Sequence, residues 1–220
     1  MNYWLRLMTV FSIFTMFMSC EKTEEATSVT DIDGNVYETI QIGDQEWMAE
    51  NLKVTHYRDG TAIPTEGYWL YNVDTYGALY SWQAALDSRN IAPEGWHLPT
   101  DADWKELEMA LGMSQSDANS SGNRGTNEGS KLAGSAALWI DGALENESEF
   151  GSSGFAALPG GYADYMNGGT VNRTFGAYFW SATEIGSDDA GFRGLTSTNT
   201  DIFRGEFDKG VGLSVRCLKD

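Results

Sequence analysis

The sequence predicts an α+β domain in which two helices pack on short, twisted, mostly antiparallel strands joined by long loops. Three observations indicate this class. Residues 100–112 carry the start signal, the apolar spacing and the end signal of a helix. Short stretches of alternating apolar and polar residues, typical of half-buried strands, recur before and after it. Twenty-five glycines against four prolines indicate many tight turns between these elements.

The helix over residues 100–112 is the best-defined element. Thr100 follows a proline and can cap the first turn, and Asp103 stands where a capping box places its acidic residue. Gly112 is positioned to end the helix. An apolar stripe recurs at helical spacing and should pack on a sheet; its members are Trp104, Leu107 and Leu111.

Another helix is predicted to begin at Asp74 or Thr75 and to end within residues 87–90. Its apolar face comprises Leu79, Trp82 and Leu86. Residues 114–130 are rich in Ser, Gly, Asn and Asp without periodicity, which favours a long exposed loop, and residues 131–133 can add a helical turn.

Strands are predicted wherever β-branched and aromatic residues alternate with polar ones. They cover residues 36–42, a partner beginning at Glu46, and residues 68–71, 178–183, 191–195, 201–205 and 212–218. In the last strand, three residues should alternate inward: Leu213, Val215 and Cys217. We expect Cys217 to be a small buried hydrophobe.

The N-terminus has the pattern of an export signal. Arg6 precedes an apolar stretch, residues 7–18, that is too short to span a bilayer. The residues before Cys20 resemble a bacterial lipobox, with Phe17 where Leu is usual, so residues 1–19 are predicted to be a lipoprotein signal peptide and Cys20 the lipidated residue. The alternative is an ordinary signal peptide in which Cys20 is incidental.

Residues 20–30 are predicted to be an acidic flexible tether, and residues 31–220 a single domain. The acidic residues just after Cys20 resemble the signal that carries lipoproteins to the outer face of the outer membrane in Bacteroidetes-type bacteria; the alternative is a plain solvated tether. The net charge of −18 repels nucleic acid and anionic headgroups. The expected membrane contact is therefore the lipid anchor only.

Six short motifs occur in order along the chain: residues 31–37 (DIDGNVY), 47–52 (WMAENL), 76–80 (YGALY), 95–100 (GWHLPT), 158–162 (LPGGY) and 214–217 (SVRC). Together they resemble the Fibrobacter succinogenes major paralogous domain (FISUMP) family, over about residues 31–220. The segment between Pro64 and Tyr76 is shorter than is usual for the family. The resemblance implies a secreted or lipid-anchored surface domain with a fold similar to C-type lectins and to the formylglycine-generating enzyme.

The chemistry of the chain favours a non-catalytic protein. Chemistry like that of the formylglycine-generating enzyme needs active-site cysteines, and only Cys217 lies in the domain. His56 and His97 have no Cys or His at zinc-ligand spacing, so His97 is expected to be a hydrogen-bonded structural residue. No Gly-x-Ser-x-Gly motif occurs. Glu106 and Glu108 cannot face one another on a helix, which weakens a glycosidase hypothesis.

Calcium is not supported by any motif, and no cofactor is expected. Residues 31–42 lack the Glu that ends an EF-hand loop, so residues 31–35 are predicted to form a turn. The Glu-Pro-Asn and Trp-Asn-Asp signatures of sugar-binding C-type lectins are absent. The pair Asp188 and Asp189 could hold a cation, but a solvated turn is the simpler interpretation.

A ligand-binding face remains the leading hypothesis. In lectin-like folds the ligand face is formed by loops of the C-terminal half, and aromatic side chains beside amides and carboxylates suit sugars or protein hot spots. The candidates are Tyr162, Asp164, Tyr165, Asn167, Trp180, Arg193, Asn199, Asp201 and Arg204. For each, the alternative is a core or ordinary loop residue. We expect a lipid-anchored surface domain that binds an extracellular glycan or protein. The first alternative is a structural or adhesive subunit of a surface assembly. A glycan hydrolase is the second and less favoured alternative.

Overall fold

The structure, a computed structural model, describes residues 27–164 and 169–220. The predicted signal peptide, the lipidation of Cys20 and the first part of the tether lie outside these residues. So do two of the predicted ligand residues, Tyr165 and Asn167. In the described ranges, no helix is both long enough and apolar enough to cross a bilayer.

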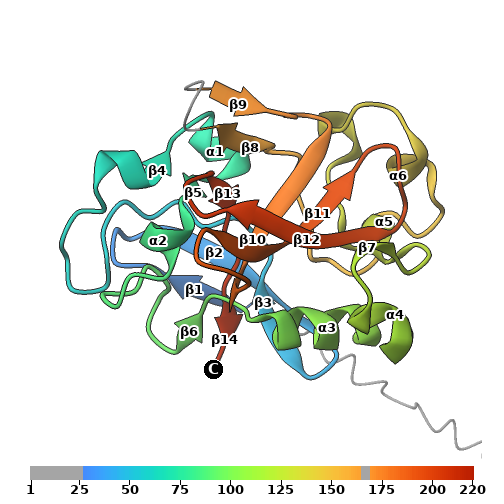
Figure 1. The fold of residues 1–220 in the computed structure, drawn as a ribbon, viewed down its shortest axis with the longest axis horizontal. Helices are drawn as coiled ribbons and strands as arrows, with labels where there is room; N and C mark the ends of the chain where they lie inside the picture. The colour runs from blue at the N-terminus through green and yellow to red at the C-terminus, as the bar shows by residue number, and fades with distance from the viewer. Residues whose placement is uncertain (1–26, 165–168) are drawn as a thin grey trace, which may run out of the picture.

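Two sheets and a separate hairpin organise the described residues (Figure 1). One sheet has the strand order β1-β2-β3-β14-β6, the other has the order β4-β5-β13-β10-β11-β12-β7, and β8 pairs with β9. Pairing between these strands is antiparallel except for β10 with β13. The bounds are β1 Ser28–Thr30, β2 Val36–Ile42, β3 Gln45–Met48, β4 Tyr68–Trp69, β5 Leu79–Tyr80, β6 Trp96–His97, β7 Gly122–Arg124, β8 Tyr162–Asp164, β9 Gly169–Val171, β10 Gly176–Glu184, β11 Asp189–Thr196, β12 Ile202–Asp208, β13 Leu213–Ser214 and β14 Leu218–Lys219.

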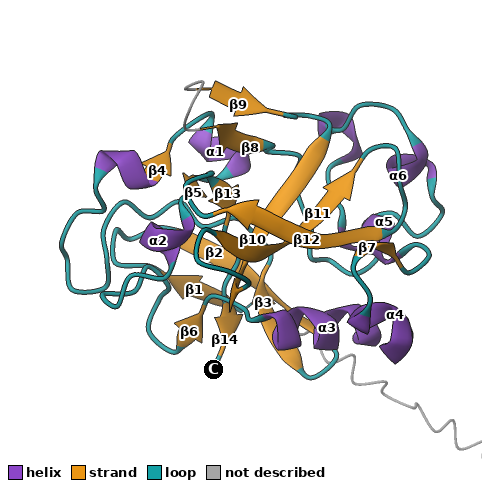
Figure 2. Ribbon diagram, viewed as in Figure 1, coloured by secondary structure: helices purple, strands orange, loops and turns teal. Residues whose placement is uncertain are grey.

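The helices are short and lie around the sheets, with long loops between them (Figure 2). Their bounds are α1 Val73–Tyr76, α2 Trp82–Ala85, α3 Asp101–Ala110, α4 Gln115–Asn119, α5 Glu128–Leu132 and α6 Ala143–Asn146, with 3-10 turns η1 Thr65–Gly67 and η2 Ala136–Leu138. The α+β class, with mostly antiparallel short strands, is therefore confirmed.

Helix α3 has the predicted start and end. The hydroxyl of Thr100 accepts a bond from the backbone N–H of Asp103 at 3.3 Å, and the Asp103 carboxylate accepts one from the backbone N–H of Thr100 at 2.8 Å. This is the predicted capping box. Gly112 follows the helix with a φ of 113°, a conformation that favours glycine.

The apolar face of α3 packs on β10, as predicted. The Trp104 ring is buried, with its centroid 4.9 Å from that of Trp47 and 5.9 Å from that of Phe179. Its indole N–H points to the backbone oxygen of Trp180 at 3.4 Å. Burial of side chains of this size contributes about 2–3 kcal/mol each, so this contact is a main source of stability for the helix.

The predicted helix over residues 74–90 is wrong. Two single-turn helices, α1 and α2, flank the strand β5 instead. Gly77 has a φ of 73°, and a Cβ there would lie 2.6 Å from the Cβ of Asn51. The chain therefore leaves helical geometry at Gly77, and the following residues pair with β4 and β13.

The long loop predicted over residues 114–130 is also wrong in part, because it contains α4, β7 and the start of α5. Ser114 caps α4, accepting a bond from the backbone N–H of Asp117 at 3.1 Å. Strand β7 pairs with the edge of β12. These are short elements that tertiary pairing stabilises, and sequence periodicity is a weak guide to them.

The strand predicted over residues 212–218 is divided between the two sheets. β13 pairs with β10 and β5, whereas β14 pairs with β3 and β6. Leu213, Val215 and Cys217 are buried as predicted, but so is Arg216 between them. Arg216 donates to the Asn51 side-chain oxygen at 2.8 Å, so the linker between the sheets is anchored on both faces.

Candidate ligand-binding groove

The outer face of strands β10, β11 and β12 alternates glycine with aromatic residues. The register pairs Tyr178 with Gly194 and Gly194 with Phe203; one row further, Phe192 pairs with Gly205. Because side chains alternate between the faces of a sheet, all five residues share one face. Rings and glycines thus form a chequered pattern across three strands.

The glycines let these rings lie against the sheet. A Cβ on Gly205 would lie 2.5 Å from the Phe203 ring, and one on Gly176 would lie 2.6 Å from the Tyr178 hydroxyl. At Gly194 the nearest ring atom, on Phe192, would be 3.2 Å away. A side chain at any of these positions would push a ring outward, so the glycines allow the rings to lie close to the sheet.

The rings contact one another as a continuous cluster. Phe207 lies 4.8 Å from Phe192 and 5.2 Å from Tyr162, centroid to centroid, and Phe203 lies 5.6 Å from Phe192. Tyr162 meets Tyr178 edge-on at 5.6 Å. Such geometry adds about 0.5–1.5 kcal/mol per pair beyond the burial itself. The floor is therefore held in shape by contacts among its own rings.

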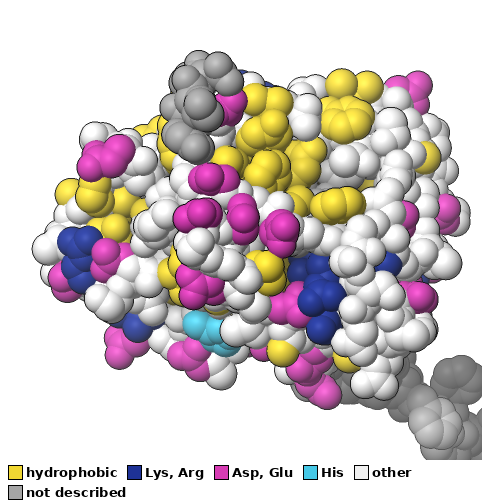
Figure 3. Space-filling model, viewed as in Figure 1, with side chains coloured by type: hydrophobic (Ala, Val, Ile, Leu, Met, Phe, Trp, Pro, Cys, Tyr) yellow, Lys and Arg dark blue, Asp and Glu magenta, His cyan; other side chains and the backbone are white. Residues whose placement is uncertain are grey.

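A groove of about 370 Å³ lies over this floor. We call it the aromatic groove; it is lined by Asn123, Tyr162, Asn172, Phe175, Tyr178, Phe192, Gly194, Thr196, Thr198, Asn199, Phe203 and Phe207. None of these residues carries a charge, although the chain has a net charge of −18. Figure 3 shows hydrophobic side chains gathered in the upper half of the view, with acidic side chains below them.

Amides and hydroxyls stand at the rim of the floor. The Asn172 amide donates to the Tyr178 hydroxyl at 3.1 Å, and burial raises the pKa of that hydroxyl. Asn172 has a φ of 57°, in the left-handed region that asparagine tolerates better than most residues. The Asn199 amide lies 3.4 Å from the Asp201 carboxylate. The groove thus combines apolar faces with uncharged hydrogen-bonding groups.

The structure places two predicted ligand residues in the interior. Trp180 is fully buried and donates its indole N–H to the backbone oxygen of Tyr80 at 2.7 Å. Arg193 is 2% exposed. Neither offers surface to a ligand, so both are corrected to core residues.

Arg193 and Arg204 belong to an ion network on the opposite face of the sheet. Arg193 donates to Glu108 at 2.6 Å and to Asp101 at 2.9 Å, and Arg204 donates to Asp101 at 2.7 Å. Arg124 also binds Glu108. Although burial opposes ionisation, these cations hold the pKa of the Asp101 carboxyl at about 2. The network joins α3 to the sheet, and Arg204 is structural.

The other predicted residues divide between the groove and its surroundings. Tyr162 and Asn199 line the aromatic groove. Asp164 lies in β8 and Asp201 lies just before β12. Both are partly buried, and neither lines the groove. Sequence reasoning missed the largest part of the floor, namely Tyr178, Phe192, Phe203 and Phe207. The signal was the period-two alternation of glycine and aromatic residues in residues 176–180, 191–195 and 203–207.

His56, His97, Cys217 and Asp31 are engaged in ion pairs, in the core or in a turn. His97 lies 2.7 Å from Asp220, and His56 lies 2.6 Å from Asp33. Cys217 is fully buried, and burial raises the pKa of its thiol well above its usual value. Asp31 accepts from the backbone N–H groups of Asp33 and Asn35, which confirms the predicted turn. In residues 27–164 and 169–220 no three His, Cys, Asp or Glu side chains are grouped to hold a metal ion.

The sheets and the groove define a small α+β domain with one uncharged, aromatic face. The model of the Fibrobacter succinogenes major domain family matches residues 40–219, and the chain belongs to this family. The resemblance to the family is thereby confirmed, and five of the six motifs lie within the matched residues. No curated protein and no solved structure matches the chain.

Three of the family motifs meet in the core, away from the groove. Asn51 of the second motif bonds Arg216 of the last, and Gly77 of the third lies against Asn51. Of the groove-lining residues, only Tyr162 falls within a motif. Membership of the family therefore explains the fold, and the groove must be interpreted from its own chemistry.

Proposed function

We propose that this protein is a non-catalytic, lipid-anchored surface domain that binds a neutral glycan in the aromatic groove. The observation that carries this proposal is that a groove in a chain of net charge −18 is lined without a single charged side chain. A charged ligand would find no partner there. Sugar rings, by contrast, present apolar C–H faces and hydroxyls.

The lining matches both parts of a sugar. Aromatic faces pack against the C–H faces, and the amides of Asn123, Asn172 and Asn199 can donate to and accept from hydroxyls. Phe203 is 39% exposed and offers the most accessible large ring. A groove that is largely preformed loses little free energy to ordering when it binds.

The proposed fold is lectin-like, and the location of the groove supports it. Every groove-lining residue comes from the C-terminal half of the chain, where lectin-like folds form their ligand face. The apolar stretch before Cys20 supports export and lipid anchoring, and the acidic residues after Cys20 support display on the outer face of the bacterial outer membrane.

The test is binding of residues 27–220 to a broad glycan array, with and without calcium. We expect saturable binding to neutral glycans, weakened roughly tenfold by Phe203→Ala through loss of one stacking ring. The matched control is Ile185→Ala, which removes a 52% exposed apolar side chain outside the groove. Both variants should unfold at nearly the wild-type urea concentration.

Two results would overturn the proposal. Glycan binding that survives Phe203→Ala would place the site elsewhere. Absence of binding to any glycan would favour a protein partner or a surface assembly, which pull-down with cell-surface extracts would then identify, using Phe203→Ala to ask whether the groove makes the contact.

A further inference from the structure

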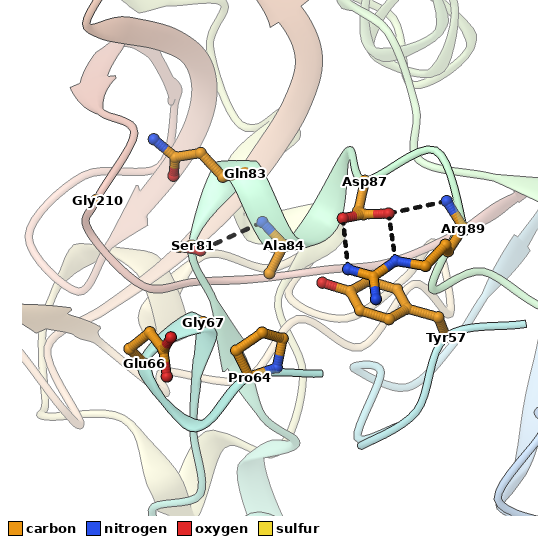
Figure 4. Close-up of a pocket in the computed structure, with 10 residues that line it drawn as sticks. All are labelled: Tyr57, Pro64, Glu66, Gly67, Ser81, Gln83, Ala84, Asp87, Arg89 and Gly210. Atoms are coloured by element: carbon orange, nitrogen blue, oxygen red, sulfur yellow. Dashed lines mark hydrogen bonds and ion pairs between the residues drawn. The ribbon is translucent and has the colours of Figure 1, made fainter. Parts of the chain in front are cut away.

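A second pocket lies beside β4 and β5, at one end of the seven-stranded sheet. It has a volume of about 490 Å³ and is formed by η1, α2, the loop around Tyr57 and the turn after β12. Figure 4 shows its lining: Tyr57, Pro64, Glu66, Gly67, Ser81, Gln83, Ala84, Asp87, Arg89 and Gly210. It shares no residue with the aromatic groove.

One wall of this pocket is the ion pair between Asp87 and Arg89. Arg89 donates to both carboxylate oxygens of Asp87, at 2.9 and 2.8 Å, and its guanidinium lies 3.9 Å from the centroid of the Tyr57 ring. Arg89 also donates to the Thr61 hydroxyl at 3.3 Å. The guanidinium holds the pKa of the Asp87 carboxyl at about 2. These two charges therefore cancel one another at neutral pH.

Glu66 supplies a charge that is not cancelled. In the described parts of the chain, no Lys, Arg or His nitrogen forms an ion pair with its carboxylate, and its one side-chain bond is a long 3.5 Å contact from the Thr65 hydroxyl. In Figure 4 its side chain lies beside Pro64, across the pocket from the Asp87–Arg89 pair. Two carboxylates against one guanidinium leave the pocket with a net charge of minus one.

The rest of the lining suits an alkyl stem that ends in an amine. Pro64 provides an exposed apolar wall, the buried side chains of Ala84 and Tyr57 close the base of the pocket, and the Gln83 amide oxygen is an acceptor. An ammonium group has three donors and no acceptor, so it complements this set, whereas a carboxylate ligand would oppose Glu66. The charge of the whole chain attracts cations over a longer range.

We propose that this pocket binds an alkylammonium group, the chemistry of a lysine side chain. Glu66 forms the ion pair with the ammonium, and Pro64 packs against the methylenes. The group could come from a free amine or from a lysine presented by a peptide, and the experiment separates these sources.

The test is titration of the ¹⁵N-labelled protein, followed by amide NMR shifts, with two small probes whose side chains have the same four carbons. Nα-acetyl-lysine methylamide carries the amine, and Nα-acetyl-norleucine methylamide lacks it. We expect the lysine probe to shift pocket resonances, such as Gly67 and Ala84, and the norleucine probe to bind at least fivefold more weakly. A lysine-containing peptide tested beside its norleucine counterpart shows whether a peptide backbone strengthens binding.

Glu66→Gln removes the unpaired charge from an exposed position, so the protein should fold normally. We expect it to weaken the lysine probe about fivefold, as for an accessible ion pair. Glu206→Gln, which makes the same change at an exposed site outside both pockets, should leave binding unaltered. Equal binding of both probes, equal effects of the two variants, or no shift of pocket resonances at millimolar probe would each overturn the proposal.

Discussion

The buried ion network gives the sharpest stability prediction. Glu108 is fully buried and accepts two bonds from Arg124, at 2.7 and 2.9 Å, and one from Arg193 at 2.6 Å. Glu108→Gln keeps the volume of the side chain but removes its charge. It also turns one acceptor into a donor that faces a guanidinium.

The loss of stability depends on which hydrogen-bond partners each arginine retains after the substitution. Arg193 retains Asp101 at 2.9 Å, but the remaining side-chain contact of Arg124 is the Met113 sulfur at 3.6 Å. Arg124 is only 5% exposed, so its charge is left almost without compensation. Breaking a buried pair in this way costs about 3–5 kcal/mol, a large part of the typical stability of a domain.

Urea unfolding of residues 27–220 at pH 7 measures this loss as a lower midpoint at unchanged slope. The matched control is Glu106→Gln, the same change on an exposed position of the same helix, which should alter stability by less than about 0.5 kcal/mol. Equal midpoints for the two variants would refute the assignment of Glu108 as the centre of the network.

Three further predictions use independent features. The Asp101 carboxyl has a folded pKa of about 2, below its ordinary value of 3.8, so it stabilises the fold above about pH 4 and loses that contribution as the pH falls towards 2. The stability difference between wild type and Asp101→Asn, about 2 kcal/mol at pH 7, should therefore shrink across that window in urea titrations; a constant difference would contradict it. Gly129→Ala places a Cβ 2.2 Å from the Asp201 backbone oxygen, and we expect it to destabilise the folded protein by more than about 1 kcal/mol in thermal unfolding. The control is Gly186→Ala, where the added Cβ would have nothing within 4 Å and stability should not change. Similar melting temperatures for the two variants would disprove the close packing at Gly129. Cys217, buried with a raised thiol pKa, should react with a thiol reagent only in urea, and rapid reaction in the native protein would show the strand linker to be open.

Local signals predicted local structure well. The α3 helix was predictable because its cap, its apolar stripe and its terminal Gly112 all lie within thirteen residues of sequence. The turn at Asp31 and the strand over residues 36–42 were predictable for the same reason. In each case the deciding interactions join residues near one another in the chain.

The errors arose where distant residues decide the conformation. The helix predicted over residues 74–90 was broken at Gly77 by packing against Asn51, 26 positions earlier. The loop over residues 114–130 contains β7, which exists because β12 offers an unpaired edge. Composition alone gives no access to such contacts, since the same residues would be loop in another tertiary setting.

Strand parity, rather than residue type, explains why Arg193 and Arg204 were misassigned to the site. Tyr162 and Asn199 were singled out from the sequence and line the groove, but residue type does not say which face of a strand a side chain occupies. Arg193 lies between Phe192 and Gly194, so placing the aromatic residues on the groove obliges Arg193 to face α3. The same parity separates Phe203 from Arg204.

This parity makes binding and stability separable by experiment. Phe203 and Arg204 are adjacent in β12, yet the first faces the aromatic groove and the second binds Asp101 on the opposite face. Phe203→Ala should therefore reduce ligand binding with little change in the urea midpoint, while Arg204→Ala should lower the midpoint and leave glycan affinity unaltered in the protein that remains folded. If both substitutions changed both quantities together, the two faces of the sheet would be coupled, and the groove could not be a preformed site carried on a rigid sheet.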